Sequence, residues 1–493
     1  MIFNARDGSV PGASWAWKKV VRFGVAFLFV VGFITVLWPS GEPVRLPLQT
    51  TPNITLAPDV SCELDYDKMT SLNILKVAQY TRREIVLDMT EEPVPYTQWL
   101  EQPFLQMPKG TEGAADGCSI PAPVTLRVPV PPKSADASHI DFGVATSATR
   151  LNESLNAFAH WAGYSRARIF ALIERDESEN GIQDVKAKAE SLGINLYITE
   201  SDDDYLNRYF ALIPLLEKNA RETTQWGCII DDDTFFLSMP RLVDALAKYD
   251  HTTSMYIGGL SESIPQIATF GMIGFGGAGV FLSKPLLTEM TNVYDQCSAM
   301  DFTGDRRIAI CVYRYTQTRL TVDHRLRQLD LMHDASGFFE SGREPPLTVH
   351  HWKSWFHADM PKLAVVAELC GDTCLLRKWH FGDGWILTNG FSVIKYHVDP
   401  DKDDLAMEKT WDSHNGATDE SYLHELGPLR RKDEHKRSFQ LVDAVHEPND
   451  RVTQWYVMRD EKNGDQVLEL SWRKSTERVQ TPLYALRAPA AHG

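Results

Sequence analysis

Short apolar segments alternate with longer polar ones over residues 139–233, and this alternation constrains the fold more than any other feature of the chain. The apolar segments, read as strands, cover residues 140–146, 167–173, 194–198 and 226–230. The segments between them have helical spacing over residues 152–162, 184–192 and 204–221. Continuous apolar strands joined by helices predict a mostly parallel, Rossmann-like sheet covered on both faces. We therefore predict an α/β fold whose binding groups gather at the carboxyl ends of the strands.

The regions on either side of this α/β segment differ from it in composition and pattern. Residues 39–137 are rich in Pro, Thr and Ser, which predicts a stem that contributes at most one or two packed elements. After residue 370, strand-like runs alternate with turns, which predicts a smaller β-rich appendage. We therefore expect the α/β domain at residues 138–370 and the β-rich appendage at residues 371–493.

One segment near the N-terminus indicates a membrane anchor. Residues 23–38 are sixteen residues without a charge, and Lys18, Lys19 and Arg22 precede them. A helix of this length covers roughly 24 Å. The positive flank predicts that residues 1–22 stay in the cytosol and that the chain from 39 onward is lumenal. A cleaved signal peptide is the alternative, disfavoured by the long polar region before the apolar run.

Sequons and cysteines are compatible with a lumenal location. Sequons occur at Asn53 and Asn152. The seven cysteines form an odd number, so at least one is unpaired or linked between chains. We expect Cys228, inside an apolar strand, to be free. Cys370 and Cys374 are expected to form a local disulfide, since no second pair at zinc-like spacing supports a metal half-site.

Composition excludes one broad class of partner. The chain has a formal net charge of −16 and a pI of about 5.4. Nucleic-acid binding requires basic faces that displace counterions from phosphate. We therefore expect no nucleic-acid partner.

The sharpest chemical signal is the acidic triplet Asp231, Asp232 and Asp233 at the end of the fourth strand. Adjacent carboxylates repel one another unless a cation or hydrogen-bond donors compensate. Mg²⁺ and Mn²⁺ accept such oxygen ligands and bridge them to phosphate oxygens. The alternative is a surface loop that caps a helix, but the apolar residues on both sides favour metal binding.

A glycine-rich segment follows at residues 274–279. Small residues let the backbone approach a ligand closely. No Gly-Lys-Ser/Thr follows, so the segment is not a phosphate-binding loop of that kind. A tight turn is an equally good interpretation of this segment alone.

Together these motifs resemble a known family. They occur in the order DDDT at 231–234, YIGG at 256–259, GGAG at 276–279, TGD at 303–305 and LTVH at 347–350. This order resembles the Fringe and core-1 β1,3-galactosyltransferase branch of glycosyltransferase family 31. The acidic triplet and β-rich tail are most similar to the fungal-type, type II membrane members.

The resemblance implies a GT-A-type nucleotide-sugar fold, a Golgi location and an inverting hexosyltransferase that moves sugar from a UDP-sugar to a glycan or glycoprotein hydroxyl, in β1,3 linkage. It implies Mn²⁺, or Mg²⁺, as cofactor. The implied roles are metal ligation by Asp233 and His350, and proton removal by Asp305 as catalytic base. The residues implied to line the donor and sugar pocket are Asp231, Asp232, Thr146, Ser147, Arg150, Gly276 and Gly277.

Two departures keep alternatives open. The family usually has two acidic residues where this chain has Gly304 and Asp305, so one candidate base remains. His350 and His351 are adjacent, and successive strand residues point in opposite directions, so we expect only one of them, His350, at the metal. The altered acidic pair also leaves a second hypothesis, a catalytically inactive, membrane-tethered scaffold that binds glycan or protein.

Overall fold

The computed structural model describes residues 55–56, 64–105, 118–132, 134–175, 179–398 and 406–475. The expected cytosolic tail at 1–22, the expected anchor at 23–38 and the Asn53 sequon lie outside these residues. In the described part of the chain, no helix has the length and apolar character needed to cross a membrane.

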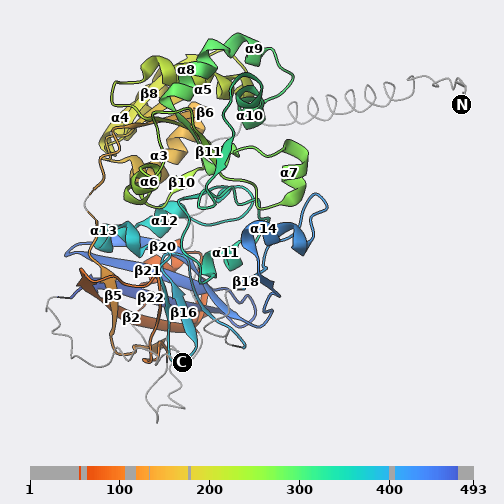
Figure 1. Ribbon diagram of the computed structural model, residues 1–493. Helices are drawn as coiled ribbons and strands as arrows, with labels where there is room; N and C mark the ends of the chain where they lie inside the picture. The colour runs from red at the N-terminus through yellow and green to blue at the C-terminus, as the bar shows by residue number, and fades with distance from the viewer. Residues whose placement is uncertain are drawn as a thin grey trace, which may run out of the picture. The chain divides into compact units, whose positions relative to one another are not determined.

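A seven-stranded mixed sheet forms the α/β part of the molecule (Figure 1). Its strand order is β13-β11-β12-β9-β6-β7-β8, and β12 runs antiparallel to both of its neighbours. The remaining neighbours pair in parallel. The strands are β6 (Ile140–Thr146), β7 (Arg168–Glu174), β8 (Asn195–Ser201), β9 (Trp226–Ile230), β11 (Tyr256–Gly258), β12 (Val280–Ser283) and β13 (Leu320–Val322).

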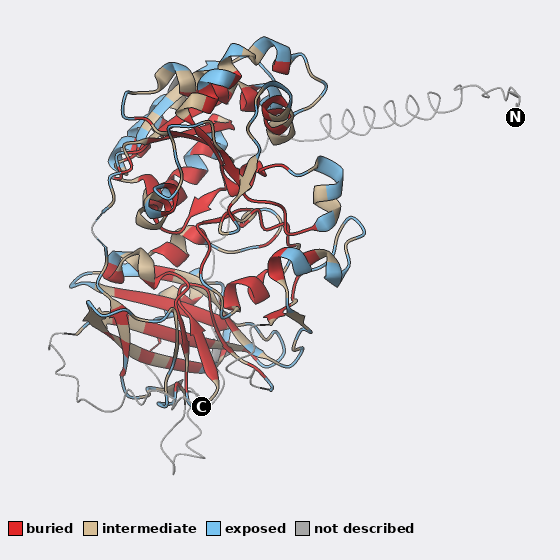
Figure 2. Cartoon of the chain, in the orientation of Figure 1, coloured by how far each residue is buried: buried red, intermediate tan, exposed pale blue. Residues whose placement is uncertain are grey.

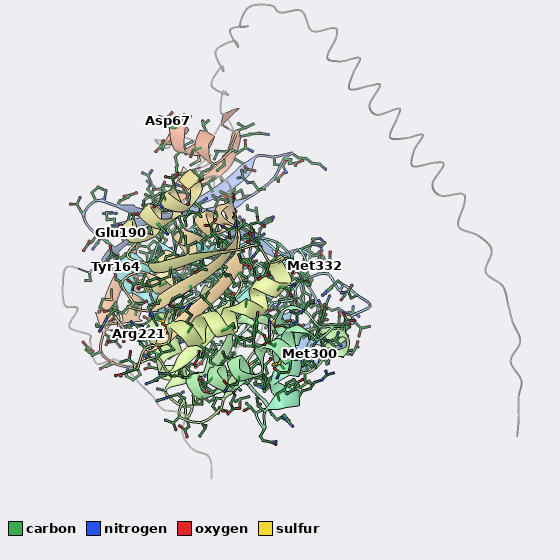
Figure 3. All side chains as sticks on the ribbon, turned by 90° about the horizontal axis from the view of Figure 1, so that it is seen from above. Asp67, Tyr164, Glu190, Arg221, Met300 and Met332 are labelled. Carbon is green, nitrogen blue, oxygen red and sulfur yellow. A yellow bond between two sulfur atoms is a disulfide. The ribbon has the colours of Figure 1, made fainter. Side chains whose placement is uncertain are left out.

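Helices cover both faces of this sheet because β6 presents apolar groups on both. Phe142 packs against Trp161 of α3 (Ala148–Ala162), with ring centroids 4.9 Å apart. On the opposite face, a Cβ at Gly143 would lie 3.1 Å from Leu216 of α5 (Tyr205–Asn219). Figure 2 shows that the strands of the sheet are largely buried, and Figure 3 shows helices lying across the sheet. Apolar residues of the strands and helices form two buried clusters. The predicted α/β class is confirmed.

The other helices of this part flank the sheet or its loops. They are α4 (Glu179–Ser191), α6 (Met239–Leu246), α7 (Ile264–Phe270), α8 (Lys284–Asn292), α9 (Tyr294–Ser298) and α10 (Gly304–Tyr315). Helix α11 (Ser336–Glu340) instead contacts β18 (Met407–Glu408). A disulfide between Cys297 and Cys311 joins α9 to α10.

A second sheet of eleven strands is assembled from both ends of the described chain. Its main order is β1-β2-β22-β21-β20-β17-β16-β15-β3, with β4 and β5 also paired to β2. The strands are β1 (Thr55–Leu56), β2 (Lys76–Thr90), β3 (Thr97–Trp99), β4 (Cys118–Ser119), β5 (Val124–Pro129), β15 (Lys378–His380), β16 (Trp385–Thr388), β17 (Ser392–Lys395), β20 (Arg437–Glu447), β21 (Arg451–Met458) and β22 (Asp465–Lys474).

This sheet corrects the expectation of a stem over 39–137 with one or two packed elements. β2, β3, β4 and β5 all come from that segment. β2 lies parallel to β22 in a ladder from Val77–Asp465 to Leu87–Lys474, and the two strands are adjacent in Figure 1 (orange and blue). The β-rich part therefore consists of the predicted appendage together with much of the predicted stem.

The two sheets are joined through packed helices. α12 (Met360–Ala364) contacts both α3 and β20, and α13 (Ala367–Cys370) follows it. Side chains from both sheets belong to one continuous hydrophobic core. The expected Cys370–Cys374 disulfide is present after α13, and Cys228 on β9 is free and buried, as predicted.

Candidate functional site

The acidic triplet lies in a tight turn directly after β9. The amide of Asp231 donates to the Thr234 hydroxyl (3.1 Å), and that hydroxyl donates to the Gly277 carbonyl (2.9 Å). The next strand, β10 (Phe235–Phe236), pairs antiparallel with β14 (Thr348–Val349). This pairing brings the residue after β14, His350, alongside the triplet from more than a hundred residues away in the chain.

His350 faces two of the three carboxylates. Its Nε2 lies 2.8 Å from Oδ1 of Asp233 and 3.3 Å from Oδ2 of Asp231. Burial lowers the pKa of His350, but the two carboxylates outweigh burial and raise it to about 10. Burial likewise raises the pKa of Asp233, and His350 outweighs that effect and lowers it to about 2. A positive charge between these side chains is therefore strongly stabilised by the carboxylates.

The donor atoms fit a divalent cation. Ligands at right angles around a cation with bonds of about 2.1 Å lie about 3 Å apart, which matches the two separations at His350 Nε2. Asp233 and His350 form a mixed oxygen and nitrogen set that suits Mn²⁺. Among the described residues, Asp233, His350 and His351 have ligand atoms close enough together to hold the ion, and Asp231 lies beside His350.

His351 departs from the expectation that neighbouring residues on a strand point apart. Its φ of 60° places it in the left-handed region, so the strand geometry ends at His350. The two imidazole centroids are only 3.8 Å apart, and one potential ligand atom from each of Asp233, His350 and His351 falls within 4.8 Å of the others. His351 Nε2 lies 3.2 Å from Oδ1 of Asp330, so this ring also has a carboxylate partner outside the triplet.

Asp232 turns away from the histidines toward the end of β6. The guanidinium of Arg150 forms a fork on its two oxygens, with Nε at 2.6 Å from Oδ2, and the Thr146 hydroxyl donates to the same oxygen. Ser147 caps α3 by accepting from the Arg150 amide (3.3 Å). The structure therefore places Thr146, Ser147, Arg150 and Asp232 together, on the β6 side of the triplet.

Two consecutive glycines connect the cation site to Asp305. The amide of Gly276 donates to Oδ2 of Asp305 (2.9 Å). A Cβ at Gly277 would lie 2.1 Å from Nδ1 of His350. Since neighbouring Cα atoms are 3.8 Å apart, Asp305 and His350 approach the same short stretch of backbone.

The environment of Asp305 suits a proton acceptor. Burial raises its pKa to about 6, and the charge of Asp231 adds to the rise, while the Gly276 hydrogen bond opposes it. A general base works best with a pKa near the operating pH.

Two residues near Asp305 were missed by sequence reasoning. Tyr209 on α5 is buried, and its hydroxyl lacks a hydrogen-bond partner among the described residues. A Cβ at Gly276 would lie 2.0 Å from that hydroxyl. Asp330 is also buried and contributes to the raised pKa of Asp305. Tyr205 and Tyr209 are one helical turn apart, so the sequence indicates that they share a helix face. It does not indicate which residues pack against that face.

Comparison with known proteins gives one family match. A family model described as Fringe-like matches residues 205–338, a segment that includes the triplet, the glycine loop and Asp305. This match confirms the predicted resemblance and, with it, the predicted enzyme class, a glycosyltransferase. A search of curated proteins finds no match.

Solved structures show only a low similarity. The mannosyltransferase PcManGT from Pyrobaculum calidifontis, in complex with GDP-Man and Mn²⁺, is 11% identical over 39% of this chain and 58% of that chain, with a TM-score of 0.27. The galactosyltransferase LgtC is 13% identical over 43% and 86%, with a TM-score of 0.29. Mouse xyloside xylosyltransferase 1 is 9% identical over 43% and 97%, also with a TM-score of 0.29. Scores this low support no inference about fold or function.

Proposed function

We propose that this chain, which carries a Fringe-like segment over residues 205–338, is an inverting, metal-dependent hexosyltransferase. It moves a hexose-type sugar from a UDP-sugar to a hydroxyl of a glycan or glycoprotein, in β1,3 linkage, on a GT-A-type fold. The observation that carries the proposal is the contact of His350 with Asp233 and Asp231, with Asp305 held nearby by the glycine loop.

Each group has a distinct task in this reaction. Asp233 and His350, with Asp231, would hold Mn²⁺ or Mg²⁺, and the ion would neutralise charge on the departing diphosphate. Arg150 balances the charge of Asp232, which leaves Thr146, Ser147 and Arg150 as a polar wall for the nucleotide. Gly276 and Gly277 would line the sugar pocket with their backbone, because Tyr209 and His350 occupy the space beside their Cα atoms.

Asp305 carries the proton transfer. Its carboxylate takes the proton from the acceptor hydroxyl as the new bond from that oxygen to the anomeric carbon forms. The bond from the anomeric carbon to the phosphate oxygen breaks on the opposite side, and its electron pair leaves with the diphosphate. One base suffices because the leaving diphosphate requires no proton.

The location is also a proposal. The uncharged segment 23–38 and the charges before it support a single-pass type II anchor in the Golgi membrane, with the described residues in the lumen.

Asp233→Ala tests the cation site. Thermal unfolding of the purified full chain with UDP is compared with and without Mn²⁺. A ligand at a hundred times its dissociation constant adds about 2.7 kcal/mol of stability, so the wild type should melt at a higher temperature only when both are present. Asp233→Ala should lose this increase and sugar transfer, because it removes a ligand.

Asp244→Ala is the matched control, since Asp244 is an exposed carboxylate on α6. It should behave as the wild type. A wild type that melts cooperatively but shows no Mn²⁺-dependent effect of UDP would contradict the enzyme and favour the inactive scaffold.

A further inference from the structure

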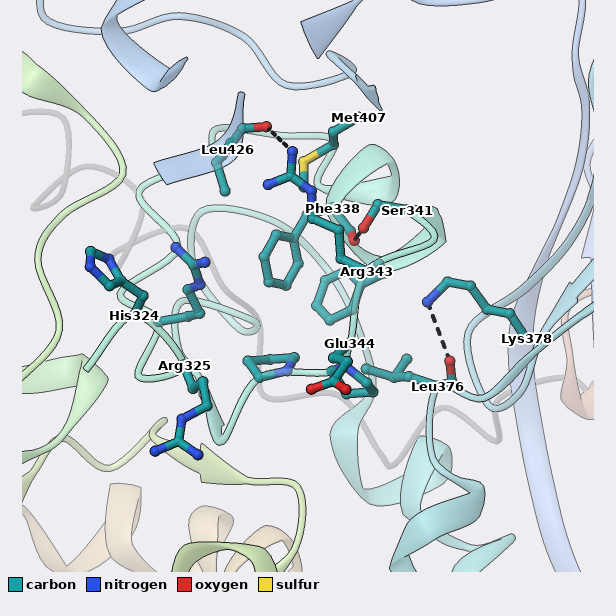
Figure 4. A pocket seen from close by; sticks show the side chains of 14 residues that line it. His324, Arg325, Phe338, Ser341, Arg343, Glu344, Leu376, Lys378, Met407 and Leu426 are labelled. Atoms are coloured by element: carbon teal, nitrogen blue, oxygen red, sulfur yellow. Dashed lines mark hydrogen bonds between the residues drawn. The ribbon is translucent and has the colours of Figure 1, made fainter. Parts of the chain in front are cut away.

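A small cavity lies apart from the cation site, where the segment that leads to β14 meets the second sheet. Its volume is about 80 Å³, several times the ~10–15 Å³ that one water molecule requires. Its lining is strongly basic and includes Arg325, Arg327, Arg343 and Lys378, against a single carboxylate, Glu344 (Figure 4).

Two of these cations are already paired. The guanidinium of Arg325 forms a fork on Asp323, with contacts of 2.9 and 2.6 Å. Arg327 lies 2.5 Å from Oε2 of the buried Glu425. Neither group therefore requires a further anion to balance its charge.

Arg343 has no carboxylate partner in the described part of the chain. Its Nη2 donates to the carbonyls of Leu426 (2.7 Å) and Gly427 (2.6 Å), and its Nη1 to that of Glu425 (3.4 Å), at the end of helix α14 (Leu423–Leu426). These carbonyl contacts fix the side chain and compensate its positive charge only in part. A guanidinium has five N–H donors, so Arg343 retains donors that these carbonyls do not use.

Lys378 is the more unusual group, because it is only 2% exposed. Its amine donates to the Leu376 carbonyl (3.3 Å), and Figure 4 shows the amine directed toward the other lining side chains. The carboxylate that opposes the fall in its pKa is Glu340, which is bonded to Lys436 (2.9 Å) and Ser392 (2.7 Å) instead. Burial lowers the pKa of Lys378 to about 7.

An unpaired buried cation is costly unless something compensates its charge. Among the described residues, no Asp or Glu lies within ion-pair distance of Arg343 or Lys378. The cavity between them holds more than one water, and Phe338, Leu376 and Leu426 give it an apolar wall. A compact oxyanion that carries its own negative charge matches this combination.

We propose that this cavity is an oxyanion site in which Arg343 and Lys378 bind a phosphate group, either free phosphate or a phosphate carried on a sugar. The site is independent of the proposed glycosyl transfer. Arg343 lies in the segment before β14 and Lys378 on β15, so an occupant would tie that segment to the second sheet.

The test is a titration of the full chain with inorganic phosphate, followed by phosphorus NMR line broadening. EDTA keeps the cation site unloaded, and sodium chloride holds the ionic strength constant. We expect saturable binding by the wild type and at least tenfold weaker binding by Lys378→Met, which retains the volume of the side chain. Lys395→Met is the matched control, because Lys395 on β17 bonds to the Asp383 carbonyl and does not line the cavity.

Each outcome decides the proposal. No saturable binding by the wild type, or equal binding by wild type and Lys378→Met, overturns it. If Lys378→Met fails to fold, Arg343→Gln takes its place with the same expectation. Asp233→Ala should bind phosphate as the wild type does, which separates this site from the proposed function.

A second arm identifies the source of the phosphate. Glucose 6-phosphate is compared with phosphate, with neutral glucose as the control. Tighter binding of glucose 6-phosphate supports a phosphate carried on a sugar, and tighter binding of phosphate supports the free ion. Binding of glucose as tight as that of its phosphate overturns the role of the charge.

Discussion

Asp305 sets the pH range in which the proposed transfer can run. Its pKa of about 6 lies above the usual value of a carboxyl group because of burial and of repulsion from Asp231. A base acts in its ionised form, so activity should rise with pH as Asp305 loses its proton. We expect the acid limb of kcat/KM at or below pH 6, since a cation at Asp231 relieves part of the repulsion. A limb well above pH 7 would assign the titration to another group.

Asp305→Asn removes the base but retains an oxygen that can accept from the Gly276 amide. A positioned base contributes about 10²–10⁴-fold, so kcat should fall by that factor. Mn²⁺-dependent binding of UDP, measured by calorimetry, should stay unchanged. Weakened UDP binding with an intact kcat would instead mean that Asp305 holds the donor.

At the scale of single residues, some features of the candidate site could be predicted from the sequence and others could not. The acidic triplet was recognisable because three adjacent carboxylates between apolar residues repel one another and require a cation or donors to compensate. The close approach of His350 and His351 could not be predicted, because it depends on a left-handed φ at His351 that no residue pattern indicates. Tyr209 was missed because a buried tyrosine looks the same in a sequence whether or not its hydroxyl has a partner.

At the scale of an element, the loop over residues 276–279 tests how the cation site is supported. Gly277→Ala would place a methyl group 2.1 Å from Nδ1 of His350, so the ring must shift. Forcing an extra methyl group into a packed site costs about 1–3 kcal/mol. We therefore expect a lower Tm and a weaker affinity for Mn²⁺, measured by melting and by metal titration.

Gly342→Ala is the control for that change, since nothing lies within 4 Å of a Cβ at Gly342. Its Tm and Mn²⁺ affinity should match the wild type. If Gly277→Ala bound Mn²⁺ normally, His350 would not be a ligand.

Two central strands of the first sheet were predictable to the residue because each is an uninterrupted buried run. The predicted 140–146 and 226–230 coincide with β6 and β9, and both strands are buried along their whole length. β2 was missed for the opposite reason. Its residues Thr81, Arg82, Arg83 and Glu84 look polar, yet the strand continues through them, with Thr81 and Arg83 buried.

At the scale of the whole molecule, the second sheet determines which part of the chain can fold alone. Deleting the residues before 139 removes β2, the strand that pairs with β22, together with β5, which pairs with β2. Val467, Leu468, Leu470 and Trp472 of β22 are buried, and loss of β2 would leave the strand with an unpaired edge. We expect a chain of residues 139–475 to aggregate, whereas residues 54–475 should melt cooperatively.

Size-exclusion chromatography and thermal unfolding distinguish these outcomes. A soluble, cooperatively melting 139–475 chain would mean that the stem segment is dispensable after all. The sequence could not indicate this dependence, because strand partners far apart in the chain leave no local signal. The Pro-rich composition of the segment also favoured the prediction of a stem.

The parallel pairing of β2 with β22 also bears on how the protein is made. A total of 375 residue positions separate Thr90 from Asp465, and a ribosome adds about 5–20 residues per second, so β2 waits roughly 20–75 s for its partner. During that time β4 and β5 can pair with one edge of β2, but the edge that will pair with β22 has no partner. The first sheet can assemble earlier, since all its strands lie before residue 323. Biosynthesis thus leaves one edge of β2 open until β22 has been made.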